Sequence, residues 1–176
     1  MMTAGQIRDT IRAVLCKGLT LEQAEQITRV LVPVRVSAGA PLMREGDGAT
    51  GLFVLLTGTV EVLKKAPDGS SRSIARVEAP SVLGEMSLVM ERPHSATVQA
   101  VTDCEIQLLT KSQFQRLISG ESVAAYKLIA AIAEVLAVRL TRLDQKVLEL
   151  SAHREAVAPV EELQTFKQKL FTEWTF

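Results

Sequence analysis

The chain has 176 residues, of which 47% are hydrophobic and only 4% aromatic, and its 20 basic and 20 acidic residues cancel to a formal net charge of zero. This length suits one domain with an accessory element, and the core must consist largely of aliphatic side chains. A zero net charge argues against an extended nucleic-acid interface, which needs clustered lysine and arginine to displace counterions.

The cysteine content and the hydropathy pattern limit the cellular setting. Two cysteines far apart in sequence, Cys16 and Cys104, do not make a disulfide framework or a zinc site, so we expect reduced, mostly buried thiols. Residues 1–12 lack the apolar centre of a signal peptide. The apolar run 128–138 is interrupted by Glu134 and is far shorter than the ~20 residues that span a bilayer. We expect a soluble, cytoplasmic protein with no membrane contact.

Residues 1–31 predict two short N-terminal helices. Three apolar residues at a spacing of four share one face of the first helix: Ile7, Ile11 and Leu15. Thr20 has the character of an N-cap, with Gln23 three residues later as its partner in a capping box. Pro33 is expected to stop the second helix, because proline cannot continue a helical hydrogen-bond ladder.

Residues 32–118 have the pattern of short strands and turns. The apolar run 52–56 indicates a strand buried on both faces. A turn signal at 67–69 separates two strand-like segments and predicts a hairpin. Two more strands are expected at 96–101 and 104–109. Many short strands with regular turn signals favour a closed barrel or jelly roll, which removes open sheet edges.

The helical period returns after Thr110, with a helix at 111–118 and a long helix from about 121 to about 154, in a predicted segment 119–156. Apolar residues recur along it at spacings of three and four: Tyr126, Ile129, Ala133, Leu136, Leu140, Leu143, Val147 and Leu150. This seam predicts a homodimer through Tyr126–Leu150; the alternative is a helix packed on its own barrel. Residues 157–176 predict a short amphipathic helix or tail.

Two motifs carry a family resemblance. The first is Glu45-Gly46-Asp47, followed by the run 52–55 and Gly58; the second is Leu83-Gly84-Glu85-Met86-Ser87-Leu88, followed by 92–98. In this order and spacing they resemble the cyclic-nucleotide-binding domain family, known from catabolite activator proteins and regulatory subunits of cyclic-AMP-dependent protein kinase. The resemblance implies a mainly β fold with flanking helices: an eight-stranded jelly-roll β-barrel followed by a long C-terminal dimerisation helix.

The segment 83–98, which we call the cassette, carries the candidate ligand-binding residues. Gly84 allows turn dihedrals and a close approach of the backbone to a ligand, and a buried Glu85 needs donors such as ribose hydroxyls. A helical turn at 86–90 would direct backbone N–H groups at an anion. By resemblance, Glu85 would hold the ribose 2′-hydroxyl and position 94 would contact the phosphate. The implied set is Gly84, Glu85, Met86, Ser87, His94, Ser95 and Ala96.

The chain departs from the family pattern at two places. His94 stands where members of the family have an arginine, and a histidine with a pKa of ~6.5 is mostly uncharged at neutral pH. Losing a charge-assisted bond to a buried anion costs about 2–5 kcal/mol. Arg92 is two residues away, but Pro93 restricts the backbone between them. Leu143 and Asp144 align with family residues that touch adenine and form a candidate lid, although Leu143 cannot donate a hydrogen bond.

The sequence does not favour an enzyme or a DNA-binding protein. Only His94 and His153 are available to a jelly-roll metal site, on different elements, and no serine or cysteine nucleophile is paired with a base. The segment after Leu150 suits one short helix and not a helix-turn-helix, so no DNA binding is expected.

The sequence therefore predicts a stand-alone regulatory module. Its expected ligand is cyclic AMP, or else cyclic GMP, with no other cofactor and no metal. Ligand occupancy would bias the helix after Ile118, and the dimer would pass that change to an unidentified protein partner. The alternative is a dimeric scaffold of the same fold that binds no ligand, in which His94 is a surface or partly buried imidazole.

Overall fold

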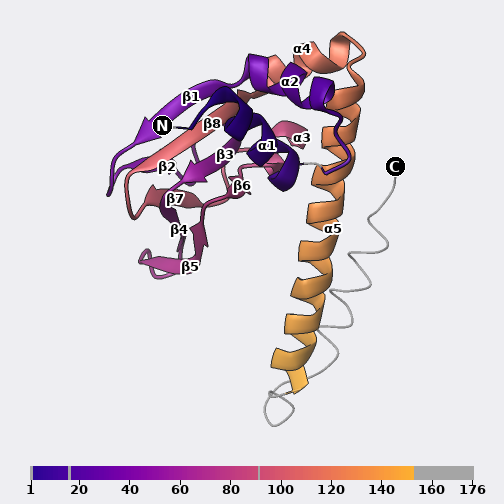
Figure 1. Cartoon of the computed structure of the whole chain (residues 1–176). Helices are drawn as coiled ribbons and strands as arrows, with labels where there is room; N and C mark the ends of the chain where they lie inside the picture. Colours follow the sequence, from indigo (N-terminus) through magenta and orange to yellow (C-terminus); the bar gives the residue numbers. More distant parts are fainter. Residues whose placement is uncertain (1, 16, 91, 153–176) are drawn as a thin grey trace. The chain divides into compact units, whose positions relative to one another are not determined.

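The fold is built from two antiparallel four-stranded sheets with helices before and after them. A computed structural model describes residues 2–15, 17–90 and 92–152 (Figure 1). The strands of this part are β1 (Val32–Val36), β2 (Pro41–Met43), β3 (Gly51–Thr57), β4 (Thr59–Lys65), β5 (Ser71–Glu78), β6 (Ser81–Leu83), β7 (Thr97–Ala100) and β8 (Cys104–Thr110). The helices are α1 (Ala4–Val14), α2 (Leu21–Val30), α3 (Met86–Val89), α4 (Lys111–Ser119) and α5 (Val123–Ala152).

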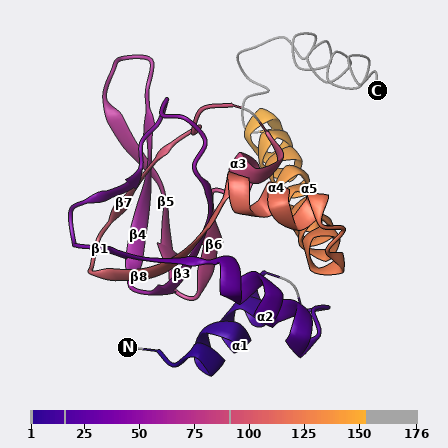
Figure 2. The same cartoon turned by 90° about the horizontal axis from the view of Figure 1, so that it is seen from above.

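The two sheets enclose an aliphatic core. Their strand orders are β1-β8-β3-β6 and β2-β7-β4-β5, and the helices α3 and α4 lie side by side (Figure 2). The core residues between the sheets are Met43, Phe53, Leu55, Val60, Leu83, Val98, Ala100, Cys104 and Ile106. This arrangement confirms the predicted jelly roll. The buried thiol of Cys104 confirms one of the two cysteine predictions, and Cys16 lies outside the described residues.

Individual strands match the sequence pattern closely. Six consecutive residues of β3, from Gly51 to Leu56, are buried, as the continuous apolar run predicted. The β4–β5 hairpin crosses the predicted turn at 67–69 and pairs Thr59 with Glu78 at its far end. Apolar runs form strands buried on both faces because neither face of the strand then meets water.

Proline does not end the second helix, contrary to prediction. α2 ends at Val30, and the next residue, Leu31, already has extended dihedrals with φ −74° and ψ 145°. Pro33 lies inside β1, opposite Gln107 of β8. β1 is an edge strand of its sheet, and an edge position tolerates a residue that lacks an N–H donor. The strand region therefore begins at Val32.

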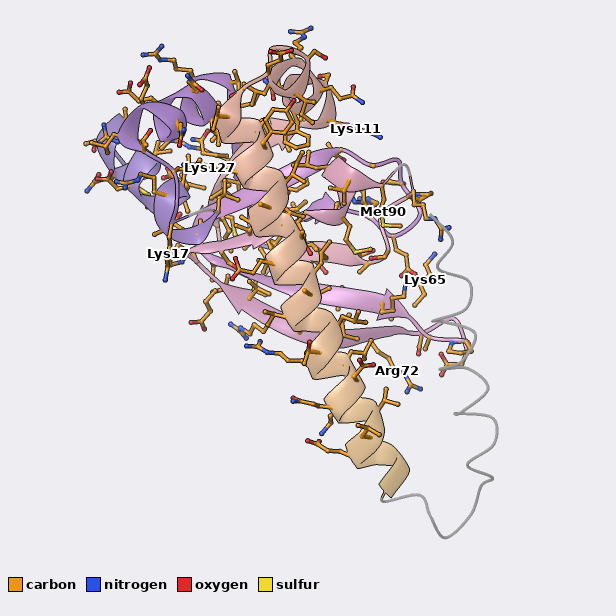
Figure 3. The ribbon with its side chains drawn as sticks, turned by 90° about the vertical axis from the view of Figure 1, so that its right-hand side faces the viewer. Lys17, Lys65, Arg72, Met90, Lys111 and Lys127 are labelled. Carbon is orange, nitrogen blue, oxygen red and sulfur yellow. The ribbon has the colours of Figure 1, made fainter. Side chains whose placement is uncertain are left out.

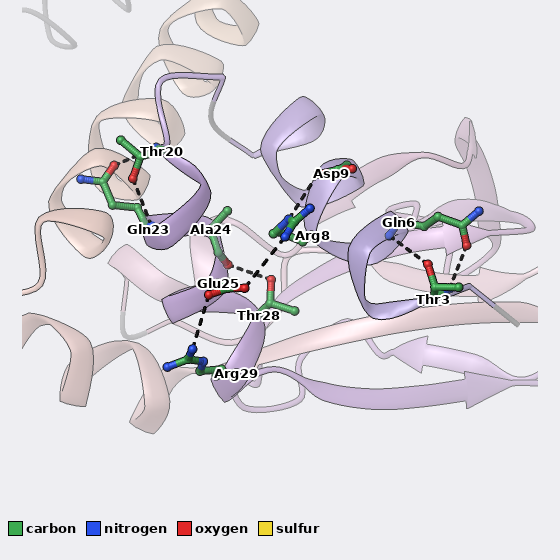
Figure 4. A network of polar contacts seen from close by, with 10 residues as sticks. All are labelled: Thr3, Gln6, Arg8, Asp9, Thr20, Gln23, Ala24, Glu25, Thr28 and Arg29. Atoms are coloured by element: carbon green, nitrogen blue, oxygen red, sulfur yellow. Dashed lines mark hydrogen bonds and ion pairs between the residues drawn. The ribbon is translucent and has the colours of Figure 1, made fainter.

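The N-terminal helices are held by their apolar faces and by the polar contacts of their caps and side chains, which Figure 4 shows. Thr20 and Gln23 form the predicted capping box, with Gln23 N–H donating to Thr20 Oγ1 at 3.2 Å. Arg8 and Arg29 approach the carboxylate of Glu25 at 3.9 and 3.4 Å. Such exposed ion pairs contribute little, about 0–1 kcal/mol each, so burial of the apolar faces, including Ile11, Ala24 and Ile27, is the larger stabilising contribution.

The long helix α5 confirms the predicted element: it begins at Val123 and continues to Ala152, the last described residue, so the expected end near 154 lies outside the described residues. The chain forms two compact units, Met1–Ala133 and Glu134–Phe176, and their boundary falls within α5. In the first unit Leu128 and Ile132 are buried, and Lys127 Nζ donates to Gly18 O at 2.7 Å and to Gln23 Oε1 at 3.0 Å. These first turns of α5 therefore pack on their own domain.

The predicted seam residues of α5 are largely uncovered. Tyr126, Leu140 and Leu143 are 51%, 50% and 60% exposed. The side chain of Leu150 and the predicted segment 157–176 lie outside the described residues. The domain boundaries at 31, 118 and 156 remain predictions. Within residues 2–15, 17–90 and 92–152, no helix is long and apolar enough to cross a membrane.

Candidate ligand-binding cassette

Buried polar side chains are concentrated in the cassette. Across the part of the chain whose side chains the structure describes, the buried polar or charged residues are Glu85, Ser87 and His94, at 5%, 5% and 6% exposure. Burying a polar group is unfavourable unless it is hydrogen-bonded. Three such groups in one short segment therefore need hydrogen-bond partners, and no buried side-chain nitrogen or oxygen of the described residues lacks one.

Gly84 turns the chain from β6 into α3 in a conformation that needs glycine. Its φ is +73°, and a Cβ atom there would lie 2.7 Å from Gly51 O and 3.2 Å from Phe53 Cδ2. Both the left-handed dihedral and the close approach of β3 exclude a side chain. The predicted turn dihedral is confirmed, and the approach of the backbone to a ligand stays a prediction.

The short helix after Glu85 forms as predicted, but two of its N–H groups are already used. The N–H of Ser87 donates to Gly84 O at 2.9 Å, and that of Leu88 donates to Glu85 O at 3.2 Å. The tight turn folds the start of α3 back on the carbonyls that precede it. The expectation that these groups point at an anion is therefore wrong for Ser87 and Leu88. The Met86 side chain is 41% exposed.

The His94 imidazole is buried between two hydroxyl groups. Its Nε2 is 2.9 Å from Thr50 Oγ1, and its Nδ1 is 3.3 Å from Ser87 Oγ. Its backbone N–H donates to Asp47 O at 2.8 Å, and its carbonyl accepts from Gly46 N–H at 2.9 Å. A neutral imidazole suits this setting, because one nitrogen donates and the other accepts. The interpretation of His94 as a surface group is excluded.

Burial also decides the charge state of His94. Burial lowers the pKa of the imidazole below its ordinary value, and the nearby carboxylate of Asp47 opposes this only in part. The imidazole is therefore neutral at pH 7. The sequence predicted an uncharged residue from the ordinary pKa of histidine, but it did not reveal the partners Thr50 and Ser87, because no local pattern links position 50 to position 94.

Ser95 brings a second set of groups to the cassette that the sequence did not reveal. Lys64 Nζ, on β4, donates to the carbonyl oxygen of Ser95 and lies 2.9 Å from Glu45 Oε1. Glu45 Oε2 accepts from the backbone N–H of Lys65 at 2.9 Å, and the N–H of Glu45 donates to Thr97 Oγ1 at 3.0 Å. The Lys64 ammonium and the Lys65 N–H hold the pKa of Glu45 below its ordinary value.

The structure brings together only part of the predicted site. Gly84, Glu85, Met86, Ser87, His94, Ser95 and Ala96 all belong to the first unit, around the turn from β6 to β7. Leu143 and Asp144 belong to the second unit, so their role as a lid stays a prediction.

A cavity of about 740 Å³ lies away from the cassette, between α2 and the turn from α4 to α5. Its lining includes Gln26, Arg29 and Arg116, and none of the cassette residues that the structure describes. Among the described residues, no group of histidine, cysteine, aspartate and glutamate side chains could hold a metal ion.

Comparison with known proteins identifies the class to which this cassette belongs. The family model described as cyclic nucleotide-binding domain matches residues 33–121, which include both sheets, the cassette and α4. The chain therefore belongs to the cyclic nucleotide-binding domain family. The glycine turn and buried glutamate of the cassette fall in the middle of the matched region.

Individual relatives agree with this assignment. The chain is 30% identical over 120 residues to the cyclic AMP receptor protein of Thermus thermophilus, covering 68% of this chain and 56% of the relative. It is 28% identical over 112 residues to a cyclic-GMP-dependent protein kinase of Caenorhabditis briggsae, covering 63% of this chain and 14% of the kinase. The chain thus spans about half or less of these curated relatives. The matched family is one of regulatory domains and not of enzymes.

Solved structures show the same fold. A cyclic nucleotide-binding domain from Methylobacillus flagellatus superimposes with a TM-score of 0.73 at 22% identity, covering 83% of each chain. The catabolite activator protein of Thermus thermophilus gives a TM-score of 0.70 at 27% identity, covering 78% of this chain and 62% of the other. The first similarity, at its low identity, establishes the fold alone.

Proposed function

We propose that the protein is a cytoplasmic regulatory module that binds a cyclic nucleotide in the cassette. Cyclic AMP is the first candidate ligand, and cyclic GMP is the second. One observation carries the proposal: Glu85, Ser87 and His94 are buried together beside the glycine turn at Gly84. A sugar-phosphate offers hydroxyl donors for a carboxylate such as Glu85 and anionic oxygens for N–H and O–H donors. The names of several relatives supply the ligand class.

The binding should be weak compared with a cassette that carries an arginine. An arginine could place two charge-assisted hydrogen bonds on a phosphate. His94 is neutral, and both of its ring nitrogens already have hydroxyl partners. A missing charged contact to a buried anion costs about 2–5 kcal/mol, roughly 30-fold to several thousand-fold in affinity.

The second part of the proposal is a relay through the long helix to a partner protein. Leu140 and Leu143 are half exposed or more, and exposed apolar side chains repeated at heptad spacing favour pairing with another helix. We propose a homodimer through Tyr126–Leu150, with ligand occupancy biasing the helices after Ile118. The partner would be a protein and not DNA, because the chain has no net positive charge.

Calorimetric titration of the purified protein with cyclic AMP and cyclic GMP tests this proposal. We expect micromolar binding of at least one nucleotide, and loss of binding in Glu85→Gln. The titration is repeated at about pH 6 and about pH 7.5, on either side of the ordinary histidine pKa. If His94 contacts the phosphate, binding takes up a proton there and affinity rises as the pH falls. Measurable affinity with a flat pH profile would contradict that contact.

The alternative function is a dimeric scaffold without a ligand. It is favoured by the hydrogen bonds that the cassette groups already make within the chain. The hydroxyls of Thr50 and Ser87 are bonded to the ring nitrogens of His94, and the Gly84 carbonyl accepts from the Ser87 N–H. Absence of heat for both nucleotides at both pH values, with a dimer still present, would support the scaffold and overturn the ligand proposal.

A further inference from the structure

A phosphate in the cassette needs a cation, and position 94 does not supply one. His94 is neutral and bonded at both ring nitrogens. Arg92 is exposed on the other side of Pro93. No contact fixes Arg92 against the cassette among the described residues, so the better candidate is a cation outside the motif that the structure holds beside it.

Lys64 meets this requirement. It lies near the end of β4, thirty-one residues before Ser95 in sequence, and its ammonium group donates to the Ser95 carbonyl. Glu45 holds the same ammonium at 2.9 Å, and the N–H of Lys65 fixes the other oxygen of that carboxylate at 2.9 Å. Lys64 is therefore placed against the cassette by a carboxylate that is itself oriented by the backbone.

The ammonium group keeps a donor for a ligand. A lysine ammonium has three N–H donors, and two of them have acceptors, Ser95 O and Glu45 Oε1, within the part of the chain that the structure describes. The side chain of Lys64 is 46% exposed, so a solute can reach it. A phosphate beside Ser95 would meet a cation that is already positioned.

We propose that Lys64 supplies the cationic contact to the phosphate of the ligand that position 94 lacks. This inference rests on the proposed function and adds a residue from outside the cassette motif to its site. Lys64 is a point charge, shared here with Glu45, so it offers the phosphate one charged donor without orienting it as the planar fork of an arginine would. The contact is also partly exposed, which makes it sensitive to salt.

The neighbouring lysine offers a matched control. Lys65 carries the same charge on the same strand and is labelled in Figure 3, and successive side chains of a strand point to opposite faces. The backbone N–H of Lys65 donates to Glu45, whereas the Lys65 ammonium acts on that carboxylate through its charge. Lys64→Met and Lys65→Met therefore remove one identical charge each, from different sides of β4.

The test is titration with cyclic AMP at low and at physiological salt. We expect Lys64→Met to weaken binding about tenfold, Lys65→Met to change it less than about twofold, and Lys64→Arg to retain most of it. Lys64→Met should also flatten the salt dependence of binding. Thermal unfolding of each variant confirms that it is folded, which is expected for a half-exposed side chain.

Each outcome decides between the two levels of the proposal. Equal effects of Lys64→Met and Lys65→Met, or no effect of either, would overturn the role of Lys64 while the binding function stands. A large loss in Arg92→Met with none in Lys64→Met would assign the contact to Arg92 instead. If neither the wild-type chain nor its His94→Arg variant binds cyclic AMP or cyclic GMP, the binding function and the Lys64 contact are overturned together.

Discussion

The cassette and the second part of α5 distribute their side chains in opposite ways. In the cassette, the polar residues Glu85, Ser87 and His94 are at most 6% exposed, while in α5 the apolar residues Leu140, Leu143 and Leu148 are at least 50% exposed. Buried polar groups need hydrogen-bond partners, and exposure of large apolar groups is unfavourable for an isolated domain. We therefore expect a small polar ligand to bind in the first region and an apolar helix to pair with the second.

The two regions differ in how many partners their side chains already have within the chain. Within the cassette the imidazole of His94 has hydroxyl partners at 2.9 and 3.3 Å, so the unliganded state is already stable. The exposed leucines of α5 can gain only from contacts outside their own helix. We therefore expect association through α5 to contribute more free energy than ligand binding in the cassette.

The largest expected effect is on association through α5. Replacing Leu140 and Leu143 together by lysine should weaken the dimer by at least about 3 kcal/mol, or more than roughly 100-fold, because each buried leucine contributes about 1.5–3 kcal/mol. Lysine has nearly the helix propensity of leucine, so the helix should persist. Light scattering after gel filtration measures the mass. Gln145→Lys is the matched control. A dimer mass that the double substitution leaves unchanged would contradict the proposal that the dimer forms through α5.

The next effect concerns the glycine turn of the cassette. Gly84→Ala should lower the free energy of unfolding by about 3 kcal/mol or more, because it combines a left-handed dihedral with a contact to Gly51 O that would be 2.7 Å. Gly69→Ala is the control, with φ +81° and nothing within 4 Å of the added atom. It should lose only about 1–2 kcal/mol from strain. Urea unfolding compares them, and equal losses would show that the contact with β3 is unimportant.

A smaller effect concerns the side chain at position 94 of the cassette. His94→Arg should strengthen cyclic AMP binding by about 1.5–3 kcal/mol, roughly 10- to 150-fold, because a charged donor replaces a neutral one. His94→Gln, which is neutral and can still hydrogen-bond, should give no gain. Calorimetry measures both variants. An arginine variant that is folded but binds no better would indicate that the pocket is blocked.

The smallest effect is the pH dependence of stability. The pKa of His94 is lowered by burial in the folded state, whereas the unfolded chain titrates near the ordinary value of about 6.5. The unfolded state therefore binds a proton first as the pH falls. The free energy of unfolding should have its highest value above about pH 7. It should decrease below about pH 6.5, by at most about 1.4 kcal/mol per pH unit. His94→Gln should remove this decrease and His153→Gln should retain it, as measured by urea midpoints.

Local patterns predicted much of the fold and the turn at the start of the cassette. The Thr20–Gln23 capping box, the buried strand β3 and the glycine turn at Gly84 depend on neighbours a few residues away, and all three form as expected. Pro33 shows the limit of the same reasoning. A proline rule for helix ends could not reveal that the chain leaves α2 at Leu31 to pair with β8 as an edge strand.

The sequence by itself determined the family, the cassette motif and the absence of an arginine at position 94, because these depend on residue identity and spacing along the chain. The tertiary structure alone decided how His94 is used and which cation reaches the cassette. Thr50 is forty-four residues from His94, and Lys64 is thirty-one residues from Ser95. Contacts at such separations are set by strand pairing in the two sheets of the jelly roll, which has no signature in the local sequence.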